Sequence, residues 1–351
     1  MDRADVRLRV EKALAVFLAQ QRAMLAGIDE TLVPVADAIE AFVLGGGKRL
    51  RPAFAYWGYR GAGGVDSDPV VTGLAALELV QASALIHDDV MDASDTRRGE
   101  PAVHRRFATM HERARWSGTP QAFGRSAAIL LGDLCLVWSD ELLYFSGLDA
   151  TTLGRARPVF DQMRTELTIG QYLDVVTQAS GETSTGRASK VARYKSAKYT
   201  VERPLQFGAA LADASPEIVA AYSRYGLPLG EAFQLRDDVL GVFGDPARTG
   251  KPAGDDLREG KRTYLVAAAV EAAGPAEREA LFAGLGDADL DDDGVARLRA
   301  IIADSGALAR TEARIAELTE QALTALDPVD LADDAGAVLR ELATAATRRT
   351  G

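Results

Sequence analysis

Apolar residues recur at three- and four-residue spacing along most of the chain, with charged residues between them. Segments such as EALFAGL, VARLRAIIA and ARIAELTEQALTAL show this pattern, which is typical of amphipathic helices that bury one face. We find no convincing run with the two-residue alternation of a half-buried strand. The pattern therefore predicts an all-α protein.

Several segments rich in glycine, proline and polar residues interrupt the helical pattern and predict breaks between helices. They are residues 44–52, 60–69, 94–101, 114–120, 179–186, 243–256 and 284–294. The length alone suggests roughly two domains, but no linker separates halves of different composition. We therefore expect one large helical domain over residues 1–351. A single core of this size is above the usual range, and a helix face buried against a partner subunit would help to stabilise it.

The composition excludes several classes of protein. The 351 residues carry 40 Lys and Arg against 51 Asp and Glu, a net charge of −11, which lacks the basic excess of a nucleic-acid binder. The single cysteine, Cys135, lies in an apolar run and excludes a disulfide framework. The N-terminal segment does not resemble a signal peptide, and no uncharged apolar run is long enough to span a membrane. We expect a cytoplasmic protein with no nucleic-acid partner and no transmembrane segment.

The first candidate site lies in residues 78–92, where an apolar helix ends in three carboxylates. Asp88 and Asp92 are four residues apart and share one helix face, whereas Asp89 is turned about 100° away. Gln81 lies two turns before Asp88 on the same face. A helix that is apolar nearly all round before it presents carboxylates is not typical of a solvated charged surface.

A second segment, residues 233–246, repeats this arrangement with Gln234, Asp237 and Asp238 before a turn of glycine and proline. Neighbouring carboxylates repel each other and are costly to bury unless a cation neutralises them. Oxygen ligands without paired His or Cys suit Mg²⁺, which commonly joins one or two carboxylates to the phosphates of a substrate. The two segments predict facing acidic walls that hold a diphosphate through Mg²⁺.

Cations accompany both acidic segments. Residues 45–47 are three glycines directly before Lys48, Arg49 and Arg51, and glycine lets backbone N–H groups approach an anion. The spacing is not that of a P-loop. Further cations near the acidic segments are Arg97, Arg98, Lys195, Lys198, Lys251 and Lys261.

The segments GGGKRLRP, HDDVMDASDTRRGEP, FQLRDDVLGVFGDP and TGKPAGDDLREGKRT together resemble the trans-isoprenyl diphosphate synthases, or polyprenyl synthetases, over about residues 40–265. This resemblance implies a large all-α bundle of the class I isoprenoid synthase type around a deep central cavity, usually as a homodimer. It implies a prenyltransferase that condenses isopentenyl diphosphate with allylic diphosphates of five, ten or fifteen carbons.

The resemblance also implies roles for individual residues. Roughly two or three Mg²⁺ ions would be held by Asp88, Asp92 and Asp237, with Asp89 and Asp238 beside them. Isopentenyl diphosphate would bind Lys48, Arg51, Gln81 and Arg98. The allylic diphosphate would contact Arg97, Lys195, Ser196, Gln234, Lys251 and Lys261. Tyr199 would line the reacting end, and Gln171 and Asp174 would lie near the metals.

Two positions depart from the pattern of the family. Gly241 stands where many members carry a third aspartate in the second motif, so we expect Asp237 to be the main ligand there. Gln81 stands where many bacterial members carry histidine, and both side chains can donate a hydrogen bond to a phosphate.

The expected reaction begins when the cations stabilise the departing diphosphate and the allylic C–O bond ionises. The double bond of isopentenyl diphosphate then attacks, and a proton is lost. Ser83 and Ala84 lie five and four residues before Asp88, where bulky aromatic residues limit the product length in this family. Because both are small, we expect the C20 product geranylgeranyl diphosphate, with longer products or farnesyl diphosphate as alternatives.

Three other functions share parts of this pattern. A class I terpene cyclase would carry a different second motif, and neither it nor a synthase that joins two allylic diphosphates would need an isopentenyl site. A non-catalytic subunit of a heteromeric synthase would typically lack the aspartates or the cations, which are present here.

Overall fold

A computed structural model describes residues 5–245, 254–287 and 289–348. In chain order its helices are α1 (Val6–Ile28), the short 3₁₀ helix η1 (Glu30–Leu32), α2 (Val33–Leu44), α3 (Leu50–Gly61), α4 (Asp68–Met91), α5 (Val103–Ala114), α6 (Pro120–Tyr144), α7 (Ala150–Ser180), α8 (Thr185–Ala192), the π-helix η2 (Arg193–Glu202), α9 (Arg203–Leu211), α10 (Pro216–Phe243), α12 (Asp255–Arg258), α13 (Tyr264–Ala272), α14 (Pro275–Gly284), α15 (Asp292–Asp304), α16 (Ala307–Thr324) and α17 (Ala335–Thr347). The all-α prediction is confirmed.

The β-structure of the described chain is one short antiparallel pair, β1 (Thr96–Arg97) and β2 (Glu100–Pro101). The turn between them places Arg98 and Gly99 at φ values of 56° and 80°. Two residues per strand are too few for an alternating pattern, so the sequence predicted only a break here. The hairpin directly follows the first acidic segment and fixes the course of the chain that carries Arg97 and Arg98.

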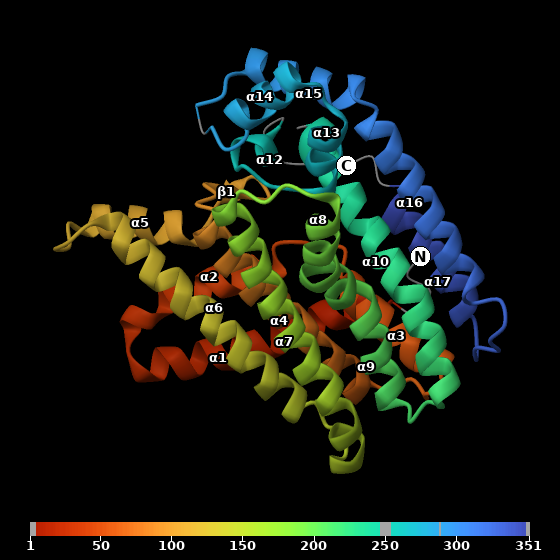
Figure 1. The fold of residues 1–351 in the computed structure, drawn as a ribbon. Helices are drawn as coiled ribbons and strands as arrows, with labels where there is room; N and C mark the ends of the chain where they lie inside the picture. Colours follow the sequence, from red (N-terminus) through yellow and green to blue (C-terminus); the bar gives the residue numbers. More distant parts are fainter. Residues whose placement is uncertain (1–4, 246–253, 288, 349–351) are drawn as a thin grey trace.

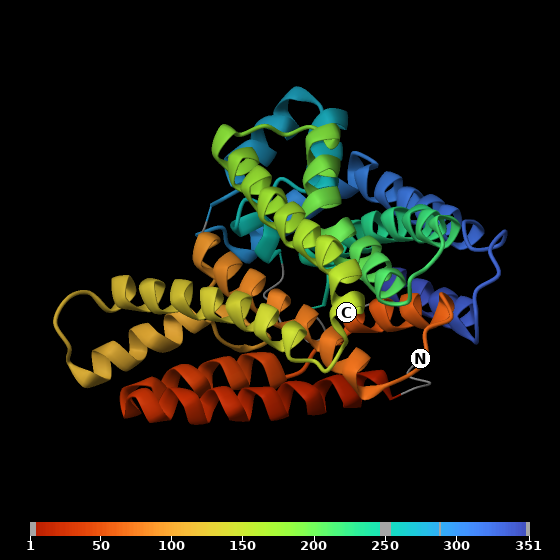
Figure 2. The same cartoon turned by 90° about the horizontal axis from the view of Figure 1, so that it is seen from below.

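Helices α4 and α10 each pack against several other helices, and α7, which is mostly exposed or half-buried, lies along η2 and α9 (Figure 1). Helix α4 packs against α6, α10 packs along α16, and η2 lies between α7 and α10. The pair α1 and α2 covers one side of the bundle, and α5 with the start of α6 projects from it (Figure 2). The two acidic segments therefore sit on long helices from opposite parts of the chain.

Two clusters of buried apolar side chains stabilise the bundle, and α10 contributes to both. Its first half places Tyr225 and Leu229 in a large cluster with α1 to α4, α6, α7 and α17. Its second half places Leu235, Val239 and Val242 in a smaller cluster with α13 to α16. The second acidic segment therefore lies on the part of α10 that packs against the C-terminal helices.

Most of the predicted breaks coincide with the ends of helices. Those at residues 44–52, 60–69, 114–120, 179–186 and 284–294 each contain the last residue of one helix and the first of the next. The break at 243–256 begins where α10 ends, although residues 246–253 lie outside the described chain.

The π-helix η2 is the main irregular element, and it ends two residues before Pro204 of α9. Proline has no backbone N–H and cannot donate a regular helical hydrogen bond. The N–H of Arg203 donates to the carbonyl of Lys198, five residues earlier, as in a π-helix. The widened turn changes which side chains share a face, so the α-helical spacing of the sequence does not predict it.

Two glycines let neighbouring helices approach η2 closely. A Cβ atom on Gly170 of α7 would lie 2.3 Å from the backbone nitrogen of Lys195. A Cβ atom on Gly230 of α10 would lie 2.5 Å from the Cα atom of Ala197. Any side chain at either position would push η2 away from its neighbours, so these glycines help to place Lys195.

Helix α4 is long and apolar enough to cross a membrane by length and composition alone, with a mean hydropathy of 1.6 over its most apolar 18-residue window. Because 72% of that window is buried inside the protein, the helix is better explained as part of the core. Glu78, which is buried in α4, interrupts its apolar sequence.

Candidate active site

A cavity of about 680 Å³ lies between α4, α7, η2 and α10, and the segment between α12 and α13 also lines it. Its acidic lining residues are Asp88, Asp174, Asp237, Asp238 and Asp256. Its cationic lining residues are Lys48, Arg51, Arg97, Arg98, Lys195, Lys261 and Arg262. Its apolar lining residues include Ala84, Leu85, Leu167, Val191 and Phe233. The cavity therefore combines carboxylates, cations and an apolar surface.

Most of the residues predicted from the sequence meet in this cavity. Besides the charged residues above, they are Gln81, Ala84, Gln171, Ser196, Tyr199 and Gln234. Ser83, Asp89 and Asp92 are not among its lining residues, and Ser83 and Asp89 are 5% and 1% exposed. Lys251, which was predicted to contact the allylic substrate, lies outside the described residues.

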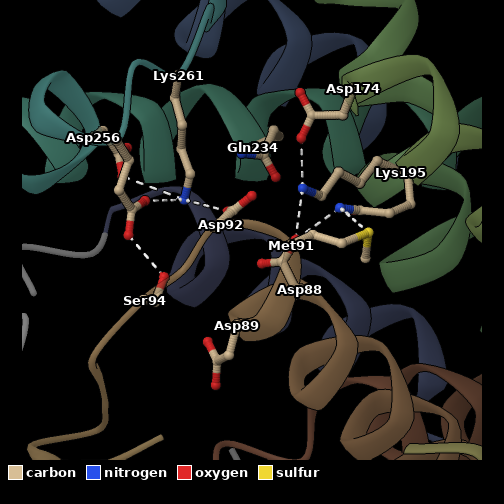
Figure 3. Close-up of polar contacts among 12 residues, drawn as sticks. Asp88, Asp89, Met91, Asp92, Ser94, Asp174, Lys195, Gln234, Asp256 and Lys261 are labelled. Atoms are coloured by element: carbon tan, nitrogen blue, oxygen red, sulfur yellow. Dashed lines mark hydrogen bonds and ion pairs between the residues drawn. The ribbon is translucent and has the colours of Figure 1, made fainter. Parts of the chain in front are cut away.

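Asp88 is the carboxylate through which the first acidic wall reaches the cavity (Figure 3). Its Oδ1 atom accepts hydrogen bonds from Nε2 of Gln171 and Nζ of Lys195, both at 3.0 Å. Lys195 also donates to Asp174 at 2.7 Å. Burial disfavours the charged form of Asp88, but Lys195 and Lys261 outweigh it and lower the pKa of this carboxyl. Asp88 is therefore an ionised group in the protein without a metal.

Asp89 points away from the cavity and binds Arg97. The Nε atom of Arg97 donates to Oδ1 of Asp89 at 2.9 Å, and its Nη2 atom lies 3.9 Å from Asp88. This contact fixes the guanidinium at the edge of the first wall, where it also lines the cavity. The sequence predicted Asp89 beside the metals on the first wall; the structure instead buries it away from the cavity, where it positions Arg97.

Asp92 carries a buried oxygen without a hydrogen bond. Its side chain is 6% exposed, and its Oδ2 atom has no hydrogen-bond partner although Nζ of Lys261 lies 3.5 Å away. Burial and the neighbouring charge of Asp88 raise the pKa of Asp92 to about 6. A cation close to this oxygen would relieve the cost of its burial.

The second acidic wall lies on α10. Asp238 is buried, and its Oδ1 atom accepts a hydrogen bond from Nε2 of Gln234 at 2.8 Å. Burial raises the pKa of Asp238 to about 7, and the nearby charges of Asp256 and Asp237 act in the same direction. A cation close to this wall would therefore relieve the cost of the buried charge of Asp238.

Lys261 connects the two walls in Figure 3. Its ammonium lies 2.7 Å from Glu259, 3.5 Å from Asp92 and 3.7 Å from Asp256. Ser94, just after the first acidic segment, donates to Glu259 at 2.9 Å and joins the same parts of the chain. The lysine thus sits between carboxylates from both halves of the sequence.

The glycine-rich segment is organised by a buried ion pair that the sequence did not reveal. Arg49 is 4% exposed, donates to Glu78 of α4 at 2.7 Å and also donates to the carbonyl of Val43. Arg49 therefore points into the protein, unlike Lys48 and Arg51, which line the cavity. Glu78 is an acidic residue within the apolar run of α4 that precedes Asp88, and this is the signal that could have indicated a buried partner.

Tyr199 on η2 arranges two of the predicted isopentenyl diphosphate ligands. Its hydroxyl donates to Oε1 of Gln81 at 3.0 Å. Arg51 lies over its ring, 4.2 Å from the centroid, and donates to Oγ1 of Thr200 at 2.9 Å. Burial raises the pKa of Tyr199, so the hydroxyl stays protonated as a donor. Because Oε1 of Gln81 accepts this bond, its amide N–H groups are available to a phosphate.

The donor set suits a hard divalent cation. Within the described residues, no group of three or more His, Cys, Asp or Glu side chains is placed so that it could hold a metal ion by itself. The carboxylates that line the cavity offer oxygen ligands alone, and Mg²⁺ commonly takes its remaining ligands from water and substrate phosphates. The buried Oδ2 atom of Asp92 has no hydrogen bond, and its positive neighbour in this structure is the ammonium of Lys261 at 3.5 Å.

Comparisons with known proteins agree with this geometry. The sequence profile of the Polyprenyl synthetase family matches residues 34–302. The geranylfarnesyl diphosphate synthase of Aeropyrum pernix is 34% identical over 292 residues, which cover 82% of this chain and 85% of that protein. The (2E,6E)-farnesyl diphosphate synthase of Mycobacterium bovis is 30% identical over 300 residues, 85% of this chain and 78% of that protein.

A solved structure extends the similarity to nearly the whole chain. It is the geranylgeranyl pyrophosphate synthase of Corynebacterium glutamicum in complex with isoprenyl diphosphate and magnesium. The two structures superpose with a TM-score of 0.96 at 43% identity, over 99% of this chain and 100% of the other. Sequence, fold and cavity lead to one conclusion: the chain belongs to the polyprenyl synthetase family and is a prenyltransferase with the all-α class I isoprenoid synthase fold.

Proposed function

We propose that the protein is an Mg²⁺-dependent synthase that condenses isopentenyl diphosphate with allylic diphosphates to give mainly geranylgeranyl diphosphate. The observation that carries this proposal is the shared cavity, in which two acidic walls, cations and apolar side chains converge. Two anionic substrates need two positively charged subsites. The allylic cation that forms in the reaction needs an apolar surface that excludes water.

The allylic diphosphate binds between the two acidic walls. Asp88, Asp92 and Asp237 would hold Mg²⁺, which supplies positive charge to the departing diphosphate when it is bound. Lys195 and Lys261, which pair with carboxylates in the free protein, then contact the phosphate oxygens. Each lysine exchanges one anionic partner for another, so its charge stays compensated throughout.

Isopentenyl diphosphate occupies the neighbouring cationic part of the cavity. Lys48, Arg51 and Arg98 neutralise its phosphates, and Gln81 donates an amide hydrogen bond. Arg98 donates a hydrogen bond to the carbonyl of Gly46 at 2.9 Å, and this bond aligns the hairpin with the glycine-rich segment. This pocket distinguishes chain elongation from cyclisation, because a cyclase needs one diphosphate site only.

The reaction breaks the C–O bond of the allylic diphosphate, and its electron pair leaves with the diphosphate. The double bond of isopentenyl diphosphate supplies the electron pair of the new C–C bond, and loss of a proton restores a double bond. The released diphosphate accepts that proton. Leu85, Leu167 and Phe233 line the cavity and exclude water that would capture the allylic cation.

The length of the product depends on the apolar part of the cavity. Ala84 lines it one helical turn before Asp88 and leaves room beneath the first wall, whereas Ser83 is buried. The synthase from C. glutamicum supports a C20 product, and the name of the A. pernix relative favours C25 as the second candidate.

The exposed apolar side chains of α6 and α7 support the proposal of a homodimer. Leu130, Val137 and Tyr144 of α6 follow one another at seven-residue spacing on one stripe and are 63%, 64% and 67% exposed. Ile169 and Tyr172 on α7 are also exposed. Light scattering after size-exclusion chromatography should give twice the mass of the chain, and Val137→Glu should shift it toward the monomer.

The direct test is incubation of the purified protein with Mg²⁺, radiolabelled isopentenyl diphosphate and an allylic primer of five, ten or fifteen carbons. Chromatography of the dephosphorylated products should show a main C20 alcohol. A main C15 or C25 alcohol would correct the product length and keep the reaction. A cyclic hydrocarbon from the primer alone would identify a cyclase, and no product from any primer would favour a non-catalytic subunit.

A further inference from the structure

The segment between α12 and α13 brings a second cation to the cavity beside Lys261. Lys261, Arg262 and Thr263 of this segment all line the cavity. The Nη1 atom of Arg262 donates a hydrogen bond to Oγ1 of Thr183, which belongs to the connection between α7 and α8. Arg262 therefore lies where two segments that are 79 residues apart in the chain meet at the cavity.

Arg262 differs from the cations of the first wall and from Lys261 in the kind of partner that it has. Arg97, Lys195 and Lys261 each form an ion pair with a carboxylate. Among the residues that the structure describes, no carboxylate pairs with the guanidinium of Arg262, and its hydrogen-bond partner is the neutral hydroxyl of Thr183. Arg262 is half-buried, and a guanidinium stays charged at neutral pH. Because a partly buried charge without an opposite charge is costly, an anion beside Arg262 would be stabilised.

The hydroxyl that Arg262 contacts belongs to a short connection beside the cavity. Residues 181–184 lead from α7 into α8, and Val191 of α8 lines the cavity. Helices α8 and α13 lie side by side (Figure 1). The backbone N–H of Thr185, at the start of α8, donates to Oε1 of Glu271 on α13 at 2.8 Å. The bond of Arg262 is thus a second attachment between the same parts of the chain, and it is the one that lies at the cavity.

The place of Arg262 in the chain points to the allylic diphosphate rather than to isopentenyl diphosphate. The proposed isopentenyl subsite contains Arg51 of α3 and Arg98 of the hairpin between β1 and β2. Arg262 instead directly follows Lys261, whose ammonium lies between carboxylates of the two acidic walls. The diphosphate that belongs between these walls is that of the allylic substrate.

We propose that Arg262 binds the allylic diphosphate and, through Thr183, attaches the connection between α7 and α8 to the bound substrate. This inference rests on the proposed Mg²⁺-dependent function and adds to it a ligand that lies outside both acidic segments. A guanidinium carries several N–H donors, so Arg262 can donate to a phosphate oxygen while it keeps its bond to Thr183. The diphosphate then supplies the opposite charge that Arg262 lacks in the free protein.

The first test measures the binding of an allylic diphosphate that does not react. The probe is a C15 diphosphate in which sulfur replaces the bridging oxygen, and calorimetry follows its binding to the full-length protein with Mg²⁺. We expect Arg262→Met to weaken binding about tenfold, since a charge-assisted hydrogen bond is lost. Arg262→Lys keeps the charge and should lose less.

The matched control is Arg258→Met, which removes an arginine four residues earlier. Arg258 donates to the carbonyl of Leu290 and to Asp292, so this variant should bind the probe as the wild type does. Circular dichroism checks that each variant is folded. Steady-state assays should show that Arg262→Met raises KM for the C15 primer about tenfold and leaves KM for isopentenyl diphosphate unchanged. Wild-type affinity of Arg262→Met for the probe, or an equal rise of both KM values, would overturn the inference.

A double-variant cycle separates contact with the phosphate from attachment of the connection. Thr183→Val removes the hydroxyl but keeps the shape of the side chain, and it should weaken probe binding only about threefold, as expected for one neutral hydrogen bond. Because Thr183 acts through Arg262, the combined variant should bind like Arg262→Met alone. Equal losses in Thr183→Val and Arg262→Met would show that attachment of the connection alone matters, and additive losses would show that Thr183 acts without Arg262. Either result would overturn the inference.

Failure of this inference and failure of the proposed function give different results. If the wild type elongates isopentenyl diphosphate but Arg262→Met and Arg258→Met bind the probe equally well, the inference is wrong and the function stands. If the wild type neither binds the probe with Mg²⁺ nor forms product, the proposed function fails, and the role of Arg262 fails with it.

Discussion

The two acidic walls of the cavity differ in how their charge is balanced. On the first wall, Asp88 pairs with Lys195, Asp89 with Arg97, and Asp92 lies near Lys261. On the second wall, the buried Asp238 accepts hydrogen bonds from the neutral amide of Gln234 and the backbone of Tyr264. Lysine and arginine side chains thus balance charge on the first wall. The second wall contains Asp238, whose ionised form is costly to bury unless a cation binds nearby.

The largest effect should come from the first wall. Asp88→Ala removes the carboxylate that orders Gln171 and Lys195 and that would hold Mg²⁺. We expect kcat to fall by about three orders of magnitude or more, since charge stabilisation of the leaving group would be lost. Steady-state assays with isopentenyl diphosphate and a C15 primer measure this.

Asp95→Asn is the matched control for that experiment. Asp95 follows the same acidic segment but pairs with Arg105 at 2.6 Å on the surface. Its kcat should stay close to that of the wild type. Near-normal turnover of a folded Asp88→Ala protein would contradict both the proposed function and the role assigned to the first wall.

The helix of the first wall should also control product length. Ala84→Phe places an aromatic ring in the cavity one turn before Asp88, so we expect the main product to shorten from C20 to C15. Ser83→Phe should shorten it as well, but at a cost in stability, because Ser83 is buried and the ring must force its neighbours apart. An unchanged product distribution in both variants would contradict a floor at these positions.

The sequence predicted the helices, most of their ends and the residues of both acidic segments, because these features are local. Apolar spacing marks a helix, and glycine and proline mark where it ends, as between Leu44 and Leu50. The four-residue spacing of Asp88 and Asp92 predicted one shared face. What the sequence could not provide was the partner of each group.

The unpredicted features depend on contacts between distant segments. Asp256 enters the space beside Gly241 from another helix, and Arg49 turns inward to reach Glu78. The π-helix before Pro204 sets the positions of Lys195 and Tyr199 by a backbone geometry without a sequence period of its own. Such features become visible only when the packing of the helices is known.

The prediction of intermediate size concerns the second wall and the dependence of protein stability on pH. The pKa of Asp238 is raised to about 7, so this carboxyl is partly protonated in the folded protein near neutral pH and fully ionised in the unfolded chain. Folding then takes up a proton, and the contribution of Asp238 to stability improves as the pH falls through about 7. The pKa of Asp92, raised to about 6, acts in the same direction at lower pH.

Asp238→Asn should therefore stabilise the metal-free protein at about pH 8. The charge that it removes opposes folding by on the order of 3 kcal/mol, and we expect the Tm to rise by about 5 °C. The advantage over the wild type should shrink toward about pH 6, where the wild-type carboxyl is protonated. Calorimetry in EDTA at several pH values measures this, and a pH-independent difference would contradict the role of charge.

The smallest predicted effect concerns the cationic pocket beside the two walls. Tyr199→Phe removes the hydroxyl that donates to Gln81 but keeps the ring under Arg51. One hydrogen bond is worth about 1 kcal/mol, so KM for isopentenyl diphosphate should rise about fivefold while kcat and KM for the allylic primer stay unchanged. Tyr199→Leu also removes the ring and should raise the same KM further. Equal effects on both substrates would show that Tyr199 acts on the whole cavity rather than on the isopentenyl subsite.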